Sequence, residues 1–169
     1  SQRAWHAGRS YWHGEENLND SSVGIEIVNI SSCKPADAGT SQYEAESAPF
    51  PACDFKTYPE EQIALLVKLL KDILTRNPDI ATINIVGHAD IAPSRKVDPG
   101  PLFPWENLHN LGIGPWPDPQ MTAQYLQLFE PQLPRLLLLQ KALNTLGYQI
   151  KETGENDLQS RQAVRAFQF

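Results

Sequence analysis

Apolar side chains recur at helical spacing between residues 59 and 78. A proline followed by two acidic residues, Pro59, Glu60 and Glu61, is typical of the first turn of a helix. The apolar positions that follow lie three or four residues apart or side by side: Ile63, Leu66, Val67, Leu70 and Leu74. Pro78 restricts the residue before it and ends the pattern. The segment is therefore predicted to form an amphipathic helix.

Two segments rich in β-branched residues flank this helix and predict strands. In residues 22–29, alternation places Glu26 on the face opposite Ile25 and Ile27. Burying a carboxylate is costly unless a partner offsets the cost, so this glutamate is a candidate functional residue. Residues 82–87 form the second predicted strand. Strand, helix and strand in this order predict an α/β layered fold.

The last part of the chain has a helical pattern of its own. Apolar residues run from 133 to 146, and Gly147 is typical of a helix stop. A polar turn at 152–157 precedes a final helix that contains Val164 and Phe167. These features predict a small helical module over residues 125–169. A proline-rich segment, 88–119, precedes it and is expected to be a stiff, irregular loop.

Composition and charge narrow the possible functions. Of the 169 residues, 41% are hydrophobic and 20% are charged, which is ordinary for a globular protein. The net charge of −6 and the lack of a Lys/Arg stripe argue against a nucleic-acid partner. The chain starts without Met, and its last helical pattern has no stop signal. We therefore expect a piece of a longer protein that extends beyond both ends.

Two cysteines, Cys33 and Cys53, bracket a polar insertion over residues 31–57. Neither belongs to a C-x-x-C pair, so a zinc–thiolate site is not expected. A disulfide across the insertion is favoured if the protein is exported to an oxidising compartment. Two free thiols are the alternative.

Residues 87–101, with the sequence GHADIAPSRKVDPGP, carry the most informative set of polar side chains. His88 follows the second predicted strand and can offer a neutral imidazole to a metal, while Asp98 can offer an oxygen. Pro99 favours an extended backbone at Asp98, which would direct Lys96 and Asp98 to the same side. An ammonium group in that position suits the stabilisation of an oxyanion. Each residue alone is also typical of a solvated surface, so the interpretation depends on the set.

This segment resembles the motif of the type 2 bacterial N-acetylmuramoyl-L-alanine amidases, whose fold is shared with the peptidoglycan recognition proteins. Three further segments resemble motifs of the family in the same order: Ala4 to Gly8, Asn17 to Glu26, and Leu102 to Asp118. Residues 139–167 are similar to a peptidoglycan-binding helical module. The resemblance implies an α/β fold with a central mixed β-sheet flanked by helices. It divides the chain into an amidase domain (1–120) and a truncated module (125–169).

The resemblance also implies the roles of individual residues. His88 and Asp98 are expected to bind one Zn²⁺, and Glu26 to activate water and transfer its proton. Lys96 is expected to stabilise the oxyanion, and His6 and Asn19 to line the substrate cleft. The family uses a further histidine ligand, which is expected upstream of residue 1. Asp90 is interpreted as a support for the loop rather than as a ligand.

The expected partners are therefore peptidoglycan and muropeptides. The resemblance implies a periplasmic hydrolase, with an outer-membrane anchor upstream of this sequence. A cytoplasmic muropeptide-recycling enzyme is the alternative location. A receptor that binds muropeptides on the same fold without cutting them is the alternative function, since fold alone does not separate the two.

Overall fold

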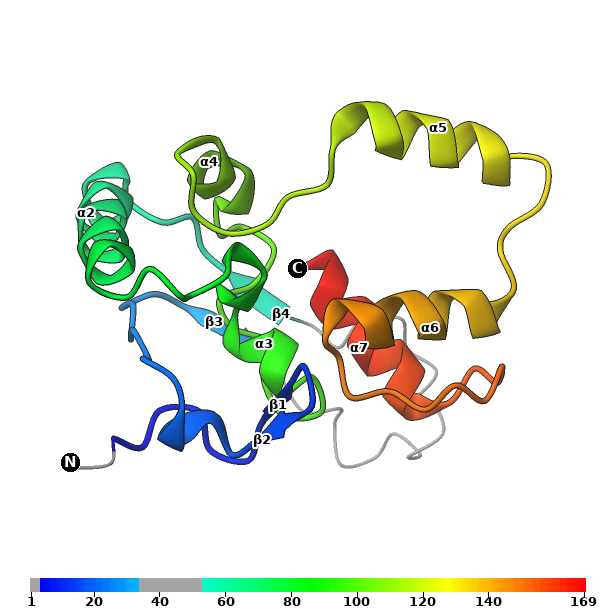
Figure 1. Ribbon diagram of the computed structural model, residues 1–169, viewed down its shortest axis with the longest axis horizontal. Helices are drawn as coiled ribbons and strands as arrows, with labels where there is room; N and C mark the ends of the chain where they lie inside the picture. The colour runs from blue at the N-terminus through cyan, green and yellow to red at the C-terminus, as the bar shows by residue number, and fades with distance from the viewer. Residues whose placement is uncertain (1–3, 34–52) are drawn as a thin grey trace.

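The computed structural model describes residues 4–33 and 53–169. Figure 1 shows α2 and α4 on one side of the molecule and the α6–α7 pair on the other, with α3 and β1 between them. The elements, in chain order, are β1 (Tyr11–Trp12), β2 (Glu15–Glu16), the 3₁₀ helix η1 (Leu18–Asp20), β3 (Ser31–Cys33), β4 (Cys53–Phe55), α2 (Glu60–Arg76), the 3₁₀ helix η2 (Thr82–Asn84), α3 (His88–Ile91), α4 (Trp105–Asn110), α5 (Pro119–Phe129), α6 (Leu136–Leu146) and α7 (Leu158–Gln168). Helices and strands both occur, and the α/β class is confirmed.

Helix α2 confirms the helix predicted from the apolar periodicity and ends two residues before Pro78. Its face with Ile63 and Leu66 is buried in a cluster with residues of the 103–113 segment. Ile25 and Ile27 pack against the same cluster, as the predicted alternation requires. Glu26 lies between them in sequence and is exposed, so no carboxylate is buried in this segment.

The two predicted strands, 22–29 and 82–87, are not strands in the structure. Residues 22–28 have no regular secondary structure, and Thr82–Asn84 form η2. A β-branched segment becomes a strand only when a neighbouring segment pairs with its backbone groups, and no described residue pairs with either. The sheets of the described residues are the two antiparallel pairs β1–β2 and β3–β4, so the expected central sheet is not found there.

Strands β3 and β4 lie at the two ends of the predicted insertion. Cys33 pairs directly with Cys53 in their register, and the two side chains form a disulfide. The prediction for the rest of the insertion falls on residues 34–52, outside the described part of the chain.

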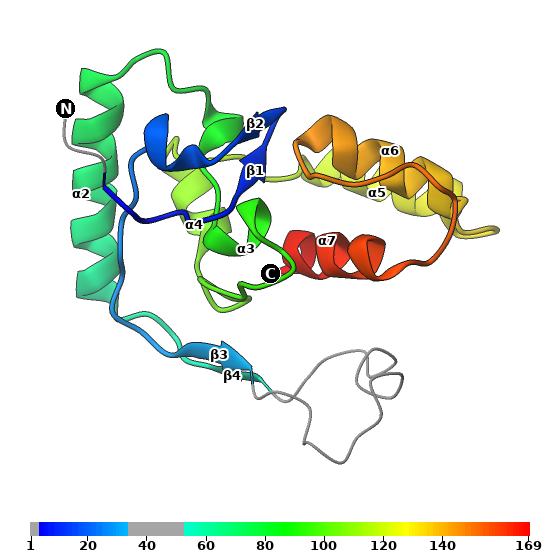
Figure 2. The ribbon, with the colours of Figure 1, turned by 90° about the horizontal axis from the view of Figure 1, so that it is seen from below.

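The carboxyl-terminal helices share a core with the amino-terminal part of the chain. One buried cluster contains residues from both: Ala7, Trp12, Leu18, Ala89, Leu143, Tyr148, Ile150, Ala163 and Ala166. Helix α7 packs against α3, which Figure 2 shows between β1 and α7. Helices α6 and α7 are as the sequence predicted, and Gly147 caps α6 with a positive φ of 130°.

Helix α5 was not predicted: it begins at Pro119, the last residue of the segment expected to be irregular, and its end overlaps the start of the predicted module at residue 125. Asp118 begins it by accepting a hydrogen bond from the Met121 amide, and Pro119 occupies its first turn. None of its residues is buried. Among the described residues, no helix has both the length and the apolar character needed to cross a membrane.

Candidate active site

His88 and Asp98 face each other at the start of α3. Helix α3 begins at His88, and the chain returns so that the Ala89 amide donates to the Asp98 carbonyl at 2.8 Å. This return places His88 Nδ1 3.0 Å from Asp98 Oδ2, although the residues are ten positions apart. The other ring nitrogen, Nε2, lies 3.3 Å from the carbonyl oxygen of Ala7. The backbone thus holds both ring nitrogens close to oxygen atoms.

Asp98 is negatively charged in this environment. Partial burial alone would raise the pKa of its carboxyl, but the hydrogen bond and charge of His88, together with the charge of Lys96, outweigh burial and lower it. The pKa of Tyr58 is raised, mainly by burial and also by the charge of Asp98. Its hydroxyl therefore stays protonated and donates to the Pro99 carbonyl at 2.9 Å. The charge of Lys96 acts on Asp98, whereas the expectation that the two side chains point to the same side stays a prediction.

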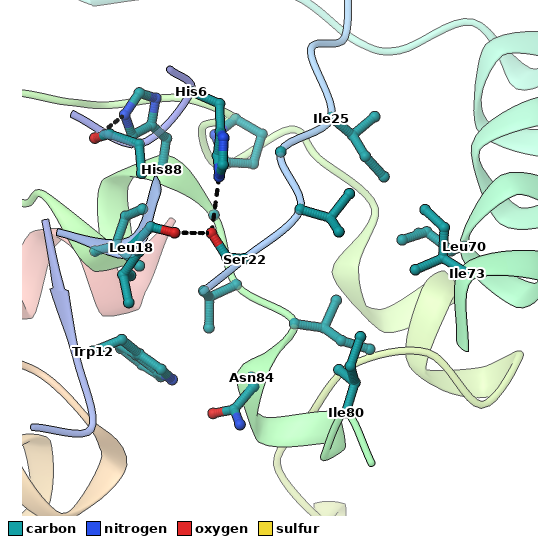
Figure 3. Close-up of a pocket in the computed structure, with 18 of the residues that line it drawn as sticks. His6, Trp12, Leu18, Ser22, Ile25, Leu70, Ile73, Ile80, Asn84 and His88 are labelled. Carbon is teal, nitrogen blue, oxygen red and sulfur yellow. Dashed lines mark hydrogen bonds between the residues drawn. The ribbon is translucent and has the colours of Figure 1, made fainter. Parts of the chain in front are cut away.

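A cavity of about 530 Å³ opens beside this pair, and Figure 3 shows part of its wall. His88, Asp98, Glu26 and His6 all line it, so four of the predicted site residues share one space. Much of the remaining wall is apolar and comes from the 22–27 segment, α2 and the 80–86 segment. Lys96 and Asn19 are not among the lining residues. The site is therefore a polar edge on a largely apolar cavity.

His6 is held in place from several directions. Its Nε2 lies 2.8 Å from Ser22 Oγ, and its Nδ1 lies 3.0 Å from the Ala4 carbonyl. The ring lies directly against Gly24, where an added Cβ would come within 2.5 Å of the His6 Cβ. A residue larger than glycine at position 24 would therefore displace the imidazole. Neither Ser22 nor Gly24 was predicted as a site residue, and the contact across 16 or more residues left no local signal in the sequence.

Asn19 does not line the cavity and supports His6 through the backbone. Its side chain is buried, and its Oδ1 accepts hydrogen bonds from the amides of His6 and Ala7, both at 2.8 Å. The Ala7 carbonyl is the same group that faces His88 Nε2. The structure therefore gives Asn19 a place in the scaffold that connects His6 and His88.

The described residues contain no group of three or more His, Cys, Asp or Glu side chains that could hold a metal. His88 and Asp98 provide two donor atoms, and their geometry fits a shared Zn²⁺. Nδ1 and Oδ2 are hydrogen-bonded at 3.0 Å, so a metal held by both residues would replace the proton between them. The anionic state of Asp98 also suits a cation. The third ligand, a histidine upstream of residue 1, stays a prediction.

Several relatives align with most of this chain. AmiD, an N-acetylmuramoyl-L-alanine amidase of Escherichia coli, is 42% identical over 167 residues, which are 98% of this chain and 55% of the relative. AmpD, a 1,6-anhydro-N-acetylmuramyl-L-alanine amidase of Enterobacter cloacae, is 40% identical over 108 residues, covering 64% of this chain and 45% of the relative. This chain thus spans about half the length of these curated relatives.

Solved structures show the same fold. AmpDH3 from Pseudomonas aeruginosa, in complex with anhydromuramic pentapeptide, matches with a TM-score of 0.73 and 36% identity, over 98% of this chain and 68% of the other. AmiD from E. coli, in complex with anhydro-N-acetylmuramic acid-L-Ala-D-gamma-Glu-L-Lys, matches with a TM-score of 0.68 and 34% identity, over the same shares of the two chains.

Two protein families match successive parts of the chain. Residues 132–169 match a peptidoglycan binding domain. Residues 1–101 match the family described as N-acetylmuramoyl-L-alanine amidase, and the chain belongs to that family.

Proposed function

We propose that the protein hydrolyses the amide bond between N-acetylmuramic acid and L-alanine, in peptidoglycan or in muropeptides. The observation that carries the proposal is the His88–Asp98 pair at 3.0 Å on a cavity that Glu26 also lines. Family membership and the muropeptide ligands named for two related structures support the same substrate class.

In this proposal His88 and Asp98, whose side chains lie 3.0 Å apart, would hold one Zn²⁺ together with a histidine upstream of residue 1. Zinc supplies a Lewis acid that polarises a carbonyl oxygen and lowers the pKa of water towards about 7. The protein fixes the direction of both ligands. The Ala89 amide holds the Asp98 backbone at 2.8 Å, and the Ala7 carbonyl faces the second nitrogen of His88.

Glu26 is the proposed proton carrier. Its carboxylate is exposed and lines the cavity, so one of its oxygens can accept a proton from the attacking water. A C–O bond forms at the lactyl carbonyl carbon, and its C–N bond to L-alanine breaks. Glu26 passes the proton to the leaving nitrogen, which becomes the free amine of the peptide. The new carboxyl group loses the second water proton to solvent, so the two products are a carboxylate on the sugar and a peptide that begins with L-alanine.

Lys96 is the proposed source of positive charge for the oxyanion at the lactyl carbonyl oxygen. Its ammonium already acts on Asp98, which lies at the edge of the cavity. A positive charge near a developing negative charge lowers the barrier. Lys96 does not line the cavity, so in this proposal its long side chain reaches the carbonyl oxygen when substrate binds.

We also propose a periplasmic location, with an outer-membrane anchor upstream of this sequence. The Cys33–Cys53 disulfide supports the first part, because such bonds persist in oxidising compartments. Alkylation of thiols in intact cells tests it: both cysteines should resist the reagent. Full labelling would favour the cytoplasmic alternative.

Digestion of purified peptidoglycan by the full-length protein tests the proposed reaction. With zinc, mass spectrometry should detect free stem peptides that begin with L-alanine, and a chelator should abolish them. Glu26→Gln should lose most of the activity, whereas Glu130→Gln, the same change at an exposed site on α5's end, should keep it. Peptidoglycan that is bound but uncut with and without zinc would overturn the proposal and leave a muropeptide-binding protein.

A further inference from the structure

The carboxyl-terminal module touches the loop that carries His88. Tyr148, which follows the last turn of α6, is 2% exposed and belongs to the buried cluster that includes Ala89 of α3. Its hydroxyl donates a hydrogen bond to Asp90 Oδ1 across 58 positions of sequence. Burial, followed by the charge of Asp90, raises the pKa of Tyr148 above its ordinary value, so this hydroxyl keeps its proton.

Asp90 transmits this contact to the start of α3. Its other oxygen, Oδ2, accepts a hydrogen bond from the Gly87 amide at 2.8 Å, which closes the first turn of the helix that begins at His88. The carboxylate is therefore held at both oxygens, one from each part of the protein. Gly87 is itself tightly placed, because a Cβ there would lie 2.6 Å from Pro99 Cδ and 3.2 Å from Asp90 Oδ2.

Further contacts prevent Tyr148 and the loop from moving apart. The Trp12 ring meets the Tyr148 ring edge-on with centroids 5.2 Å apart. Arg165 of α7 donates through Nη2 to the Pro93 carbonyl at 2.8 Å, just after α3. The His13 amide donates to the Gly147 carbonyl at 3.0 Å. These contacts hold the Tyr148 side chain in place, so its hydroxyl can position the loop.

We propose that Tyr148 is a positioning residue for the active-site loop: through Asp90 it fixes the first turn of α3 and hence the direction of His88 towards Asp98. The helical module then has a task beyond any binding of wall polymer, since it completes the support of the metal-ligand loop. The effect of the Tyr148 hydroxyl on the loop does not depend on the reaction, whereas its effect on turnover rests on the proposed amidase function.

Tyr148→Phe in the full-length protein isolates the hydroxyl, and Tyr125→Phe is the matched control on α5, where the side chain is 53% exposed. The first measurement is amide hydrogen exchange, followed by mass spectrometry, over residues 87–98 and over α2. A buried hydrogen bond stabilises by about a fivefold equilibrium factor, so exchange over 87–98 should become about fivefold faster. Exchange in α2, and throughout the control variant, should not change.

The second measurement is steady-state hydrolysis of a muropeptide. Misdirection of His88 should lower kcat by about tenfold and leave KM within about twofold, because the hydroxyl does not line the cavity. Asp90→Asn should retain protection of the loop, because its amide can still bond to both Gly87 and Tyr148, whereas Asp90→Ala should lose it.

Equal exchange over 87–98 in Tyr148→Phe and the parent protein would overturn the proposal, and so would faster exchange that extends equally to α2. A lower melting temperature with unchanged kcat would reduce Tyr148 to a packing residue and would also overturn it. If the parent protein shows no turnover, the proposed function fails, and the exchange experiment still decides the role of Tyr148.

Discussion

Replacing Gln140 tests how much a buried hydrogen-bond network stabilises the carboxyl-terminal helices. It is fully buried in α6, with 0% of its side chain exposed. Its Oε1 accepts from the Gly154 amide at 2.7 Å, and its Nε2 donates to Ser160 Oγ at 2.8 Å and to the Glu155 carbonyl at 3.0 Å. One side chain thus joins α6, the 152–157 turn and α7. Gln140→Met keeps the length of the side chain and removes all of these bonds.

The cost can be worked out group by group. The Gly154 amide loses its hydrogen-bond acceptor in a partly buried place, and an unsatisfied donor costs about 1–3 kcal/mol. The lost bond to the buried Ser160 hydroxyl adds about 1 kcal/mol, and the Glu155 carbonyl can turn to water. We therefore expect Gln140→Met to lower the free energy of unfolding by about 2–4 kcal/mol.

Urea unfolding of the full-length protein, followed by circular dichroism, measures this loss. Gln159→Met is the matched control in α7, because Gln159 also makes two hydrogen bonds, to the Gln149 carbonyl and from the Lys151 amide, but both are exposed. Water can replace them, so the control should lose less than about 1 kcal/mol. Equal losses in the two variants would refute the argument that burial of the network determines its contribution.

Three further changes test the scaffold by urea unfolding. Asp157→Ala removes the cap of α7 and should lower the free energy of unfolding by about 1 kcal/mol. Hydrogen bonds lower the pKa of Asp157, so the difference in stability between the parent protein and the variant should be present at neutral pH. It should vanish as the pH falls through and below that lowered pKa. Gly147→Ala should destabilise more than Gly154→Ala, since both glycines have positive φ but only the first would bring a Cβ to 2.7 Å from the Trp12 ring; equal losses would contradict this. Leu108→Ala, at a side chain 1% exposed, should cost about 2–5 kcal/mol, and a loss below 1 would show a loosely packed core.

The helices could be predicted because their information is local. The spacing of apolar residues in α2, and the Gly147 stop after α6, lie within the segments themselves. Helix α5 was missed although Asp118 and Pro119 are a recognised start signal, because the prolines before it suggested an irregular segment. Interpreting Asp118 as an N-cap and Pro119 as the first helical residue would have predicted α5.

The predicted strands failed for a physical reason. Residues 22–29 and 82–87 have β-branched side chains, but a strand also needs a hydrogen-bonded neighbour, which a single segment cannot reveal. The alternation still had predictive value, because Ile25 and Ile27 do face the core while Glu26 is exposed.

The site could be predicted as a set of residues but not as an arrangement. The resemblance named His88, Asp98 and Glu26, and the structure places them on one cavity. The supporting contacts join distant positions: Asn19 holds the backbone of His6, and Tyr148 holds Asp90. Such contacts depend on tertiary packing and leave no spacing pattern in the sequence.

Hydrolysis of a muropeptide in heavy-oxygen water tests the central claim most directly, because it identifies the bond that is cut. The proposed reaction adds water across the amide between the sugar and L-alanine. The labelled oxygen should therefore appear in the carboxylate of the muramic acid product, and the peptide should be unlabelled with a free L-alanine amine. A label in a peptide carboxylate, or an intact substrate in the presence of zinc, would contradict the account.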